Sequence, residues 1–237
     1  MFYLIGLGLG VDSISRHGRE ALEKCSRVYL DTYTVDFPYS LEELEKSLKT
    51  RVIRAERKAV EGMEFLKGAK KENIALLVYG SPLTATTHIT LIQEAEKSGI
   101  KFEVIFNASI LDAIGETGLQ IYKFGKITSM PGWQKNFRPE SFMDIVKENI
   151  SIGAHSLILV DIGLGFKEAI EQLEEAAKNK GMNLGKIVVC SRLGTEGRKV
   201  LYGKMEELSG KKVLSPFCII IPGKMHFVEE EMLESRE

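Results

Sequence analysis

Three stretches of this 237-residue chain are rich in glycine or in small polar residues, types that suit close contact with a ligand. They are residues 6–10 (Gly-Leu-Gly-Leu-Gly), 80–88 (Gly-Ser-Pro-Leu-Thr-Ala-Thr-Thr-His) and 107–110 (Asn-Ala-Ser-Ile). Glycines let a backbone turn sharply and let a ligand approach it closely. The hydroxyls of serine and threonine both donate and accept hydrogen bonds. Together these residue types indicate a binding site for a small molecule.

The glycine spacing at residues 6–10 differs from the dinucleotide-binding fingerprint. That fingerprint has Gly-x-Gly-x-x-Gly opening a helix. Here the third glycine comes one residue early, and Val11, Asp12 and Ser13 follow before a helix can begin. Two interpretations remain open: a tight turn at the edge of the core, or the floor of a ligand site at the end of the first strand.

The elements that would position these stretches follow from the hydrophobic pattern. Apolar runs predict strands at residues 2–7, 28–30, 52–53, 74–79 and 102–106. Helical spacing predicts intervening helices at residues 15–25, with Ser13 or Ser15 as the cap, and at residues 41–48, with Ser40 as the cap. Two more are expected, one around residues 63–66 and one that ends near residue 97. Alternating strands and helices predict a parallel sheet covered on both faces. Because parallel strands end at the same edge, the three glycine-containing or polar stretches should converge there.

The pattern changes after Gly118. We expect one or two strands in residues 121–129, further strands at 156–162, 186–190, 198–203 and 216–221, and helices at 141–149, 167–179 and 205–208. This predicts an N-terminal α/β domain with a parallel sheet, residues 1–112, and a C-terminal α/β domain with a mixed sheet, residues 113–237. The loop at residues 130–139 carries the only tryptophan, Trp133, and is either a lid or interface or a plain surface loop.

Composition excludes several classes of protein. Hydrophobic residues make up 44% of the chain and charged residues 27%, with a formal net charge of -1, so nothing demands nucleic acid or an anionic membrane as a partner. No apolar run is long enough to span a bilayer, and no basic region precedes the first apolar run, so we expect neither a membrane span nor a signal peptide.

The cysteines and histidines favour a cytoplasmic protein without a metal site. An odd number of widely spaced cysteines without a Cys-x-x-Cys pair indicates reduced thiols that pack as small apolar residues: Cys25, Cys190 and Cys218. The histidines lie far apart, and none has zinc-ligand spacing with a cysteine: His17, His88, His155 and His226.

Five segments together resemble one known family. They are residues 6–9, 80–88, 107–110, 138–142 (Arg-Pro-Glu-Ser-Phe) and 222–229 (Pro-Gly-Lys-Met-His-Phe-Val-Glu). In order and spacing, along essentially the whole chain, they are similar to the diphthine synthases of the tetrapyrrole-methylase superfamily.

The resemblance implies a two-domain tetrapyrrole-methylase-like α/β fold with S-adenosyl-L-methionine bound in a cleft between the domains. It implies a homodimeric, cytoplasmic methyltransferase of diphthamide biosynthesis that acts on the amino group of the modified histidine of translation elongation factor 2. It implies no direct contact with nucleic acid or membrane.

Carried over residue by residue, the family's cofactor contacts fall on eight positions: Leu9, Ser81, Thr84, Ser109, Ile110, Val160, Leu193 and Cys218. Two of these positions depart from the family pattern, which commonly has aspartate at Ser81 and histidine at Cys218. Serine keeps a hydrogen bond but offers no charge, which weakens the expectation of tight cofactor binding. A contact made by the backbone at Cys218 would survive the change.

Methyl transfer from a sulfonium is an in-line displacement that needs the nucleophile at roughly 3–3.5 Å and no metal ion. An acceptor amine must first lose a proton, and both desolvation and a nearby sulfonium lower its pKa. Bulk water can then take the proton, so we assign no catalytic base; His88, His226 and Asp161 are candidates only.

Two other functions fit parts of the pattern. One is a tetrapyrrole (precorrin-type) methyltransferase, which residues 80–88 and 222–229 disfavour because they resemble the diphthine branch. The other is a non-catalytic cofactor-binding protein, which the departure at Ser81 keeps open.

Overall fold

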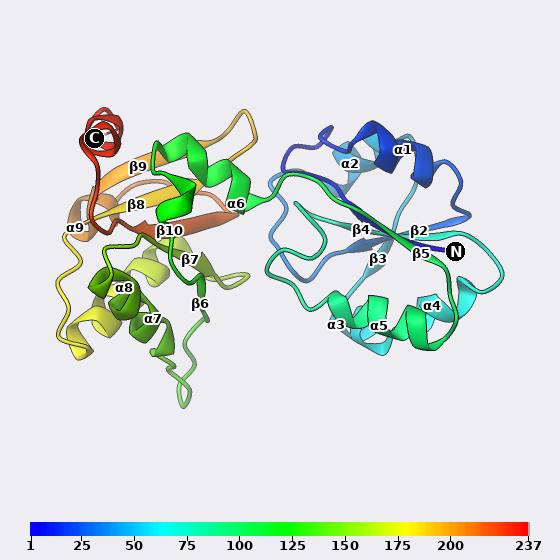
Figure 1. Cartoon of the computed structure of the whole chain (residues 1–237), viewed down its shortest axis with the longest axis horizontal. Helices are drawn as coiled ribbons and strands as arrows, with labels where there is room; N and C mark the ends of the chain where they lie inside the picture. The colour runs from blue at the N-terminus through cyan, green and yellow to red at the C-terminus, as the bar shows by residue number, and fades with distance from the viewer. Residues whose placement is uncertain (237) are drawn as a thin grey trace. The chain divides into compact units, whose positions relative to one another are not determined.

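The computed structural model describes residues 1–236 and forms two compact units (Figure 1). The first unit comprises Met1–Ile110, and the second begins at Leu111. Each unit contains one five-stranded sheet, parallel in the first and mixed in the second. The α/β class with these two kinds of sheet, expected from the sequence, is confirmed. In the described residues no helix is long and apolar enough to cross a membrane.

The sheet of the first unit has the strand order β3-β2-β4-β1-β5, and all neighbouring strands are parallel. Its strands are β1 (Phe2–Gly6), β2 (Arg27–Asp31), β3 (Ile53–Ala55), β4 (Ile74–Val78) and β5 (Phe102–Ile105). Every residue of β1 and β4 is buried, as an unbroken apolar run predicts for central parallel strands.

Helices cover both faces of this sheet, as predicted (Figure 1). They are α1 (Arg16–Leu22), α2 (Leu41–Leu48), α3 (Arg57–Gly62), α4 (Glu64–Gly68) and α5 (Ile89–Lys97). Phe2 and Leu4 of β1 belong to the core beneath α3, α4 and α5, whereas Tyr3 and Ile5 belong to the core beneath α1 and α2. The alternation of side chains along one strand thus builds two cores.

The helix starts follow the serine caps. Ser15 accepts a hydrogen bond from the N–H of Gly18 at 3.0 Å, and Ser40 forms a reciprocal capping box with Glu43. One expected helix is wrong in detail: the segment around Met63 contains two short helices, because Met63 has a left-handed backbone conformation, with φ of 54°, between them.

The sheet of the second unit has the order β6-β7-β10-β8-β9, in which only β6 and β7 are parallel. Its strands are β6 (Thr128–Met130), β7 (Ser156–Val160), β8 (Lys186–Ser191), β9 (Lys199–Lys204) and β10 (Phe217–Ile221). Its helices are α6 (Ile110–Ala113, which begins in the first unit), η1 (Ile114–Thr117), η2 (Ile121–Lys123), α7 (Ser141–Ser151), α8 (Phe166–Asn179), α9 (Met205–Leu208) and α10 (Phe227–Glu234).

The main core of the second unit lies between its sheet and helices α7 and α8 (Figure 1). Phe142 of α7 and Leu173 of α8 pack there with Ile219 of the central strand β10. The expectation of one or two strands in residues 121–129 is confirmed only at the end of that segment, where β6 begins at Thr128; the segment starts with the 3-10 helix η2.

A buried carboxylate explains this difference. Glu229 of α10 is fully buried and accepts hydrogen bonds from the Gln120 N–H (2.8 Å), the His226 N–H (2.7 Å), His155 Nε2 (3.1 Å) and the Lys123 ammonium. Burial alone would raise the pKa of Glu229, but these donors lower it to about 2. The contacts hold η2 against the start of α10.

Candidate functional site

The first two glycine-containing loops meet at the carboxyl edge of the parallel sheet. Gly8, which follows β1, and Gly80, which follows β4, exchange two backbone hydrogen bonds of 3.0 and 2.9 Å. Both have positive φ, 73° and 70°, a conformation that favours glycine. The sequence prediction that these strand ends converge is therefore confirmed in the structure.

Asn107, which follows β5, brings the third stretch to the same place. Its side-chain amide donates to the carbonyls of Gly6 (3.1 Å) and Ser13 (2.9 Å). A Cβ added at Gly6 would lie 2.6 Å from the Gly80 carbonyl oxygen, and one at Gly8 would lie 2.8 Å from Ser13 Cβ. The close approach that these two glycines allow is thus between parts of the chain itself.

Gly80 has a different environment. A Cβ added there would meet Ser109 Cα at 3.7 Å and Leu9 Cδ2 at 3.9 Å, which are ordinary contact distances. Leu9 and Ser109 are buried beside it, and Ser81, the next residue along the chain, is also buried. Thr84 follows in the same loop with its N–H bonded to the Ser81 carbonyl at 3.2 Å, and Ile110 begins α6 after Ser109. The five site residues that the resemblance assigns to the first unit therefore lie in loops that converge at one edge of its sheet.

His88 holds the loop at residues 81–88 from inside. It is 1% exposed; its Nδ1 lies 3.0 Å from the Pro82 carbonyl oxygen, and its Nε2 lies 2.9 Å from Asp31 Oδ2, without the alignment of a hydrogen bond. A carbonyl oxygen only accepts, so Nδ1 carries a proton and donates it. Asp31, at the end of β2, also accepts from the Tyr33 N–H (3.0 Å) and the Thr34 hydroxyl (2.9 Å). His88 directly precedes α5, and its burial fits a structural role at this helix start, whereas a base would need access to substrate.

The other three assigned residues gather at one edge of the second sheet. Val160 ends β7, Leu193 follows β8, and Cys218 of β10 pairs with Cys190 of β8 and with Leu159 of β7. Leu193 and Cys218 are buried. The hydrogen-bonded Cys218 thiol, together with burial, raises the pKa of Cys190 well above its usual value, so Cys190 stays a neutral thiol.

The remaining candidate bases have structural partners. Asp161 is exposed rather than buried, and its two carboxylate oxygens accept from the N–H groups of Gly132 (3.0 Å) and Ile162 (2.9 Å). It thereby fixes the start of the loop at residues 130–139. His226 caps α10 through a 3.4 Å bond from the Val228 N–H.

The tryptophan loop is well tied to helix α8. Gln172 accepts from the Trp133 N–H at 2.9 Å and donates to the Pro131 carbonyl at 2.6 Å, and Arg138 lies 5.3 Å from the centre of the Trp133 ring. Trp133 packs against the core of the second unit, whereas Phe137 is 59% exposed. The loop therefore has a fixed base and an exposed tip.

Sequence reasoning missed Asp31. The signal was available, because Asp31 follows the apolar run at residues 28–30 as a polar strand end, but no motif connects it with His88. Among residues 1–236, no group of three or more histidine, cysteine, aspartate or glutamate side chains is arranged to hold a metal ion.

Comparison with known proteins gives full-length similarity to one kind of protein. Residues 1–209 match the family model described as tetrapyrrole (corrin/porphyrin) methylases. The chain is 37% identical to a diphthine methyl ester synthase of Bos taurus, over 98% of this chain and 94% of that protein. It is 36% identical to a diphthine synthase of Methanocaldococcus jannaschii, over 99% and 98% of the two chains. A crystal structure of diphthine synthase superposes with a TM-score of 0.90 and 32% identity, covering 99% of this chain and 95% of that one.

Proposed function

The chain belongs to the tetrapyrrole methylase family, among the diphthine synthases, and we propose that it methylates the amino group of the modified histidine of translation elongation factor 2. It is a methyltransferase of diphthamide biosynthesis that uses S-adenosylmethionine, as its relatives' names and family model indicate. The observation that carries the proposal is the similarity, over nearly the full length, to a diphthine methyl ester synthase of a mammal and a diphthine synthase of an archaeon.

The residues of the first unit fit the chemical character of S-adenosylmethionine. Buried Leu9 offers apolar contact, and the hydroxyls of Ser81, Thr84 and Ser109 can hydrogen-bond a ribose or an amino-acid group. Gly80, which is itself buried, lies within ordinary contact distance of Ser109 and Leu9, so these residues surround one point of the strand-end loops. We assign the cofactor contacts to these four residues and Ile110, together with Val160, Leu193 and Cys218 of the second unit.

When bound, S-adenosylmethionine supplies an electrophilic methyl group for in-line displacement. The chain's contribution is to fix the strand-end loops. Asn107 connects Gly6, at the end of β1, with Ser13, in the segment that precedes α1. The Asp31–His88 pair holds Pro82, which is next to Ser81. Such preorganisation of loops on rigid strands is how a site can hold reactants at attack distance. Because His88 is buried and Asp161 is bonded to backbone, the proposal leaves the amine's proton to water.

We also propose an oligomeric state, a cellular compartment and a domain division for the protein. We propose that the chain works as a homodimer in the cytoplasm, where elongation factor 2 acts, with residues 1–112 and 113–237 as its two domains, and that its contacts are with that factor rather than with nucleic acid.

Mass spectrometry of elongation factor 2 tests the function. The factor, carrying the modified but unmethylated histidine, is incubated with the protein and S-adenosylmethionine, and peptides are mapped before and after mild alkali. Alkali hydrolyses a methyl ester but does not remove an N-methyl group. The mass lost on treatment therefore gives the number of methyl esters, and the added mass that remains gives the number of N-methyl groups. We expect alkali-resistant methylation on that histidine.

The result also separates the other functions. Methylation of a precorrin-type macrocycle without methylation of the factor would assign the chain to tetrapyrrole metabolism. Cofactor binding by calorimetry without any transfer would make it a non-catalytic binding protein.

A further inference from the structure

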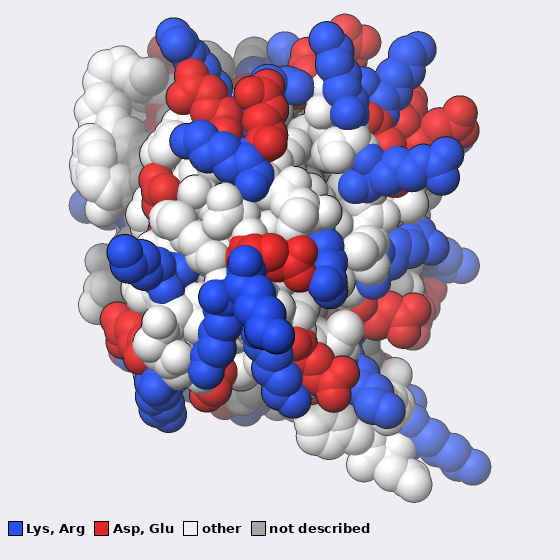
Figure 2. Space-filling model, turned by 90° about the vertical axis from the view of Figure 1, so that its right-hand side faces the viewer, with Lys and Arg blue, Asp and Glu red and all other residues white. Residues whose placement is uncertain are grey.

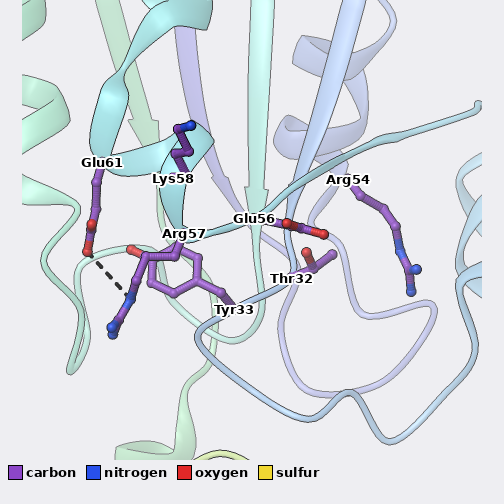
Figure 3. A pocket seen from close by; sticks show the side chains of 7 residues that line it. All are labelled: Thr32, Tyr33, Arg54, Glu56, Arg57, Lys58 and Glu61. Atoms are coloured by element: carbon purple, nitrogen blue, oxygen red, sulfur yellow. Dashed lines mark ion pairs between the residues drawn. The ribbon is translucent and has the colours of Figure 1, made fainter.

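A pocket of about 730 Å³ opens at the carboxyl ends of β2 and β3 in the first unit (Figure 3). Its lining is polar: Thr32, Tyr33, Arg54, Glu56, Arg57, Lys58 and Glu61. Because all five strands of this sheet are parallel, the pocket lies on the same sheet edge as the loops that follow β1, β4 and β5. Strand β2, whose end forms the pocket wall, pairs directly with β4, whose loop carries Ser81 and Thr84.

The charges of the pocket are only partly neutralised by the chain. Arg57 pairs with Glu61 at 3.5 Å and lies 5.5 Å from the centre of the Tyr33 ring. In contrast, Arg54, Glu56 and Lys58 are exposed and form no ion pair with any other residue in the range 1–236. Figure 3 shows the Arg57–Tyr33 contact on one side and Arg54 on the other, with Glu56 between them. The pocket therefore offers two free cations and one free carboxylate.

The pocket wall is joined to the proposed cofactor loop by buried contacts. The Asp31 carboxylate binds the Tyr33 N–H and also faces His88, which hydrogen-bonds the Pro82 carbonyl. The Tyr33 side chain also hydrogen-bonds Thr87, a second link to the same loop. A partner that rests in the pocket would thus be held in a fixed position relative to residues 81–88.

We propose that this pocket binds an anionic segment of the protein substrate and so determines affinity for elongation factor 2; the inference rests on the proposed function. The protein substrate must bring one side chain to about 3–3.5 Å from the transferred methyl group, so a second contact near the cofactor site is needed to position the surface around that side chain. The free cations of Arg54 and Lys58 suit acidic side chains of that surface, and Glu56 suits a neighbouring cation.

Local charge pairing is the appropriate mode of recognition on this unit. Figure 2 shows Lys and Arg interspersed with Asp and Glu over the face of the first unit that it presents, without a large patch of one sign. Such a surface gives little long-range attraction, so affinity has to come from specific pairs at short distance.

The test is a pair of matched charge-reversal variants. Arg54→Glu/Lys58→Glu reverses both free cations of the pocket. Lys71→Glu/Lys101→Glu makes the same charge change at exposed residues that precede β4 and β5, at the opposite edge of the sheet. For each, kcat and KM for elongation factor 2 are measured, with the Kd for S-adenosylmethionine by calorimetry.

We expect the pocket variant to raise KM for elongation factor 2 by about tenfold or more, while its kcat and cofactor Kd stay within about twofold of wild type. The control should match wild type in all three. KM of wild type should rise with salt more steeply than KM of the pocket variant, because the variant has lost the screened pairs.

Three results would overturn the inference: an unchanged KM, an equal rise of KM in the control, or a matching loss of cofactor affinity. If the charge reversal prevents folding, Arg54→Gln/Lys58→Gln is measured in its place, with a smaller rise in KM expected and the same contrary results. A wild-type protein that methylates nothing in the factor would instead refute the proposed function.

Discussion

The buried carboxylate of Glu229 provides a quantitative test of the second unit. Replacing it by glutamine keeps the size of the side chain and removes its charge. The structure surrounds the carboxylate with donors from Gln120, Lys123, His155 and His226. A glutamine has one acceptor oxygen, and its NH₂ group would face donors, so Glu229→Gln should lower the free energy of unfolding.

The magnitude follows from the pKa. The pKa of Glu229 falls from an ordinary value of 4.5 to about 2 in the folded chain. At about 1.4 kcal/mol per pKa unit, this corresponds to roughly 3–4 kcal/mol of stabilisation by the ionised form. For a chain of this size, each kcal/mol shifts the unfolding temperature by about 2–4 °C, so we expect a decrease of roughly 7–14 °C.

The sign of the pH dependence is also determined. Because the folded pKa is below the unfolded one, this stabilisation is complete above about pH 4.5 and is lost as the pH falls toward 2. The difference in the free energy of unfolding between wild type and Glu229→Gln should therefore become smaller as the pH falls from about 4.5 toward 2. His155 does not reverse the trend: burial lowers its pKa, its Nδ1 accepts from the Gly223 N–H, and its Nε2 donates to Glu229.

The assay is thermal unfolding followed by circular dichroism at neutral and acidic pH. Glu230→Gln is the matched control, because Glu230 is the next residue of the same helix turn and is exposed. The reasoning is refuted if Glu229→Gln and Glu230→Gln unfold at the same temperature at neutral pH. It is also refuted if the difference in unfolding temperature between wild type and Glu229→Gln is as large in acid as at neutral pH.

Three further changes test the first unit. Ser81→Asp should tighten S-adenosylmethionine binding or leave it unchanged, since a well-placed charged hydrogen bond contributes ~1.5–3 kcal/mol; a tenfold loss by calorimetry would contradict the assignment. Gly8→Ala should lower the unfolding temperature more than Gly99→Ala, because both have positive φ but an added Cβ at Gly8 meets a side chain at 2.8 Å and one at Gly99 meets nothing within 4 Å; equal effects would contradict this. Asp31→Ala should destabilise the chain by roughly 1–3 kcal/mol in denaturant unfolding and weaken cofactor binding, because it removes the acceptor of the Tyr33 N–H and the buried carboxylate that faces His88; a normal Kd would show that the Asp31–His88 pair does not position the loop.

The parallel sheet was predictable because its signal is local. Unbroken apolar runs in β1 and β4 identified buried strands, and the capping box at Ser40 identified the start of α2. The convergence of the strand-end loops followed from topology alone, since all strand ends of a parallel sheet share one edge.

The differences come from tertiary contacts that no local pattern shows. The break at Met63 requires a left-handed conformation at a residue that rarely adopts it. The 3-10 helix η2 replaces a predicted strand where Glu229, far along the chain, binds Gln120 and Lys123.

Some residues of the candidate site were predictable from local sequence, and others were not. Glycine and hydroxyl residues marked its loops in the first unit, whereas the positions in the second unit, such as Leu193 and Cys218, came from family resemblance because apolar residues carry no chemical signal of their own. Asp31 went unnoticed because its role depends on a contact with His88 in another loop.

Amide hydrogen exchange with and without S-adenosylmethionine tests the central claim most directly, namely that the cofactor contacts these strand ends in both units. Saturating cofactor should slow exchange at residues 8–10, 80–84 and 107–110 in the first unit, and at residues 160–161, 191–193 and 217–218 in the second. Exchange at residues 53–58, in the pocket proposed for the protein substrate, should change little. Protection confined to that pocket, or bound cofactor with no protection at the strand ends, would contradict the account.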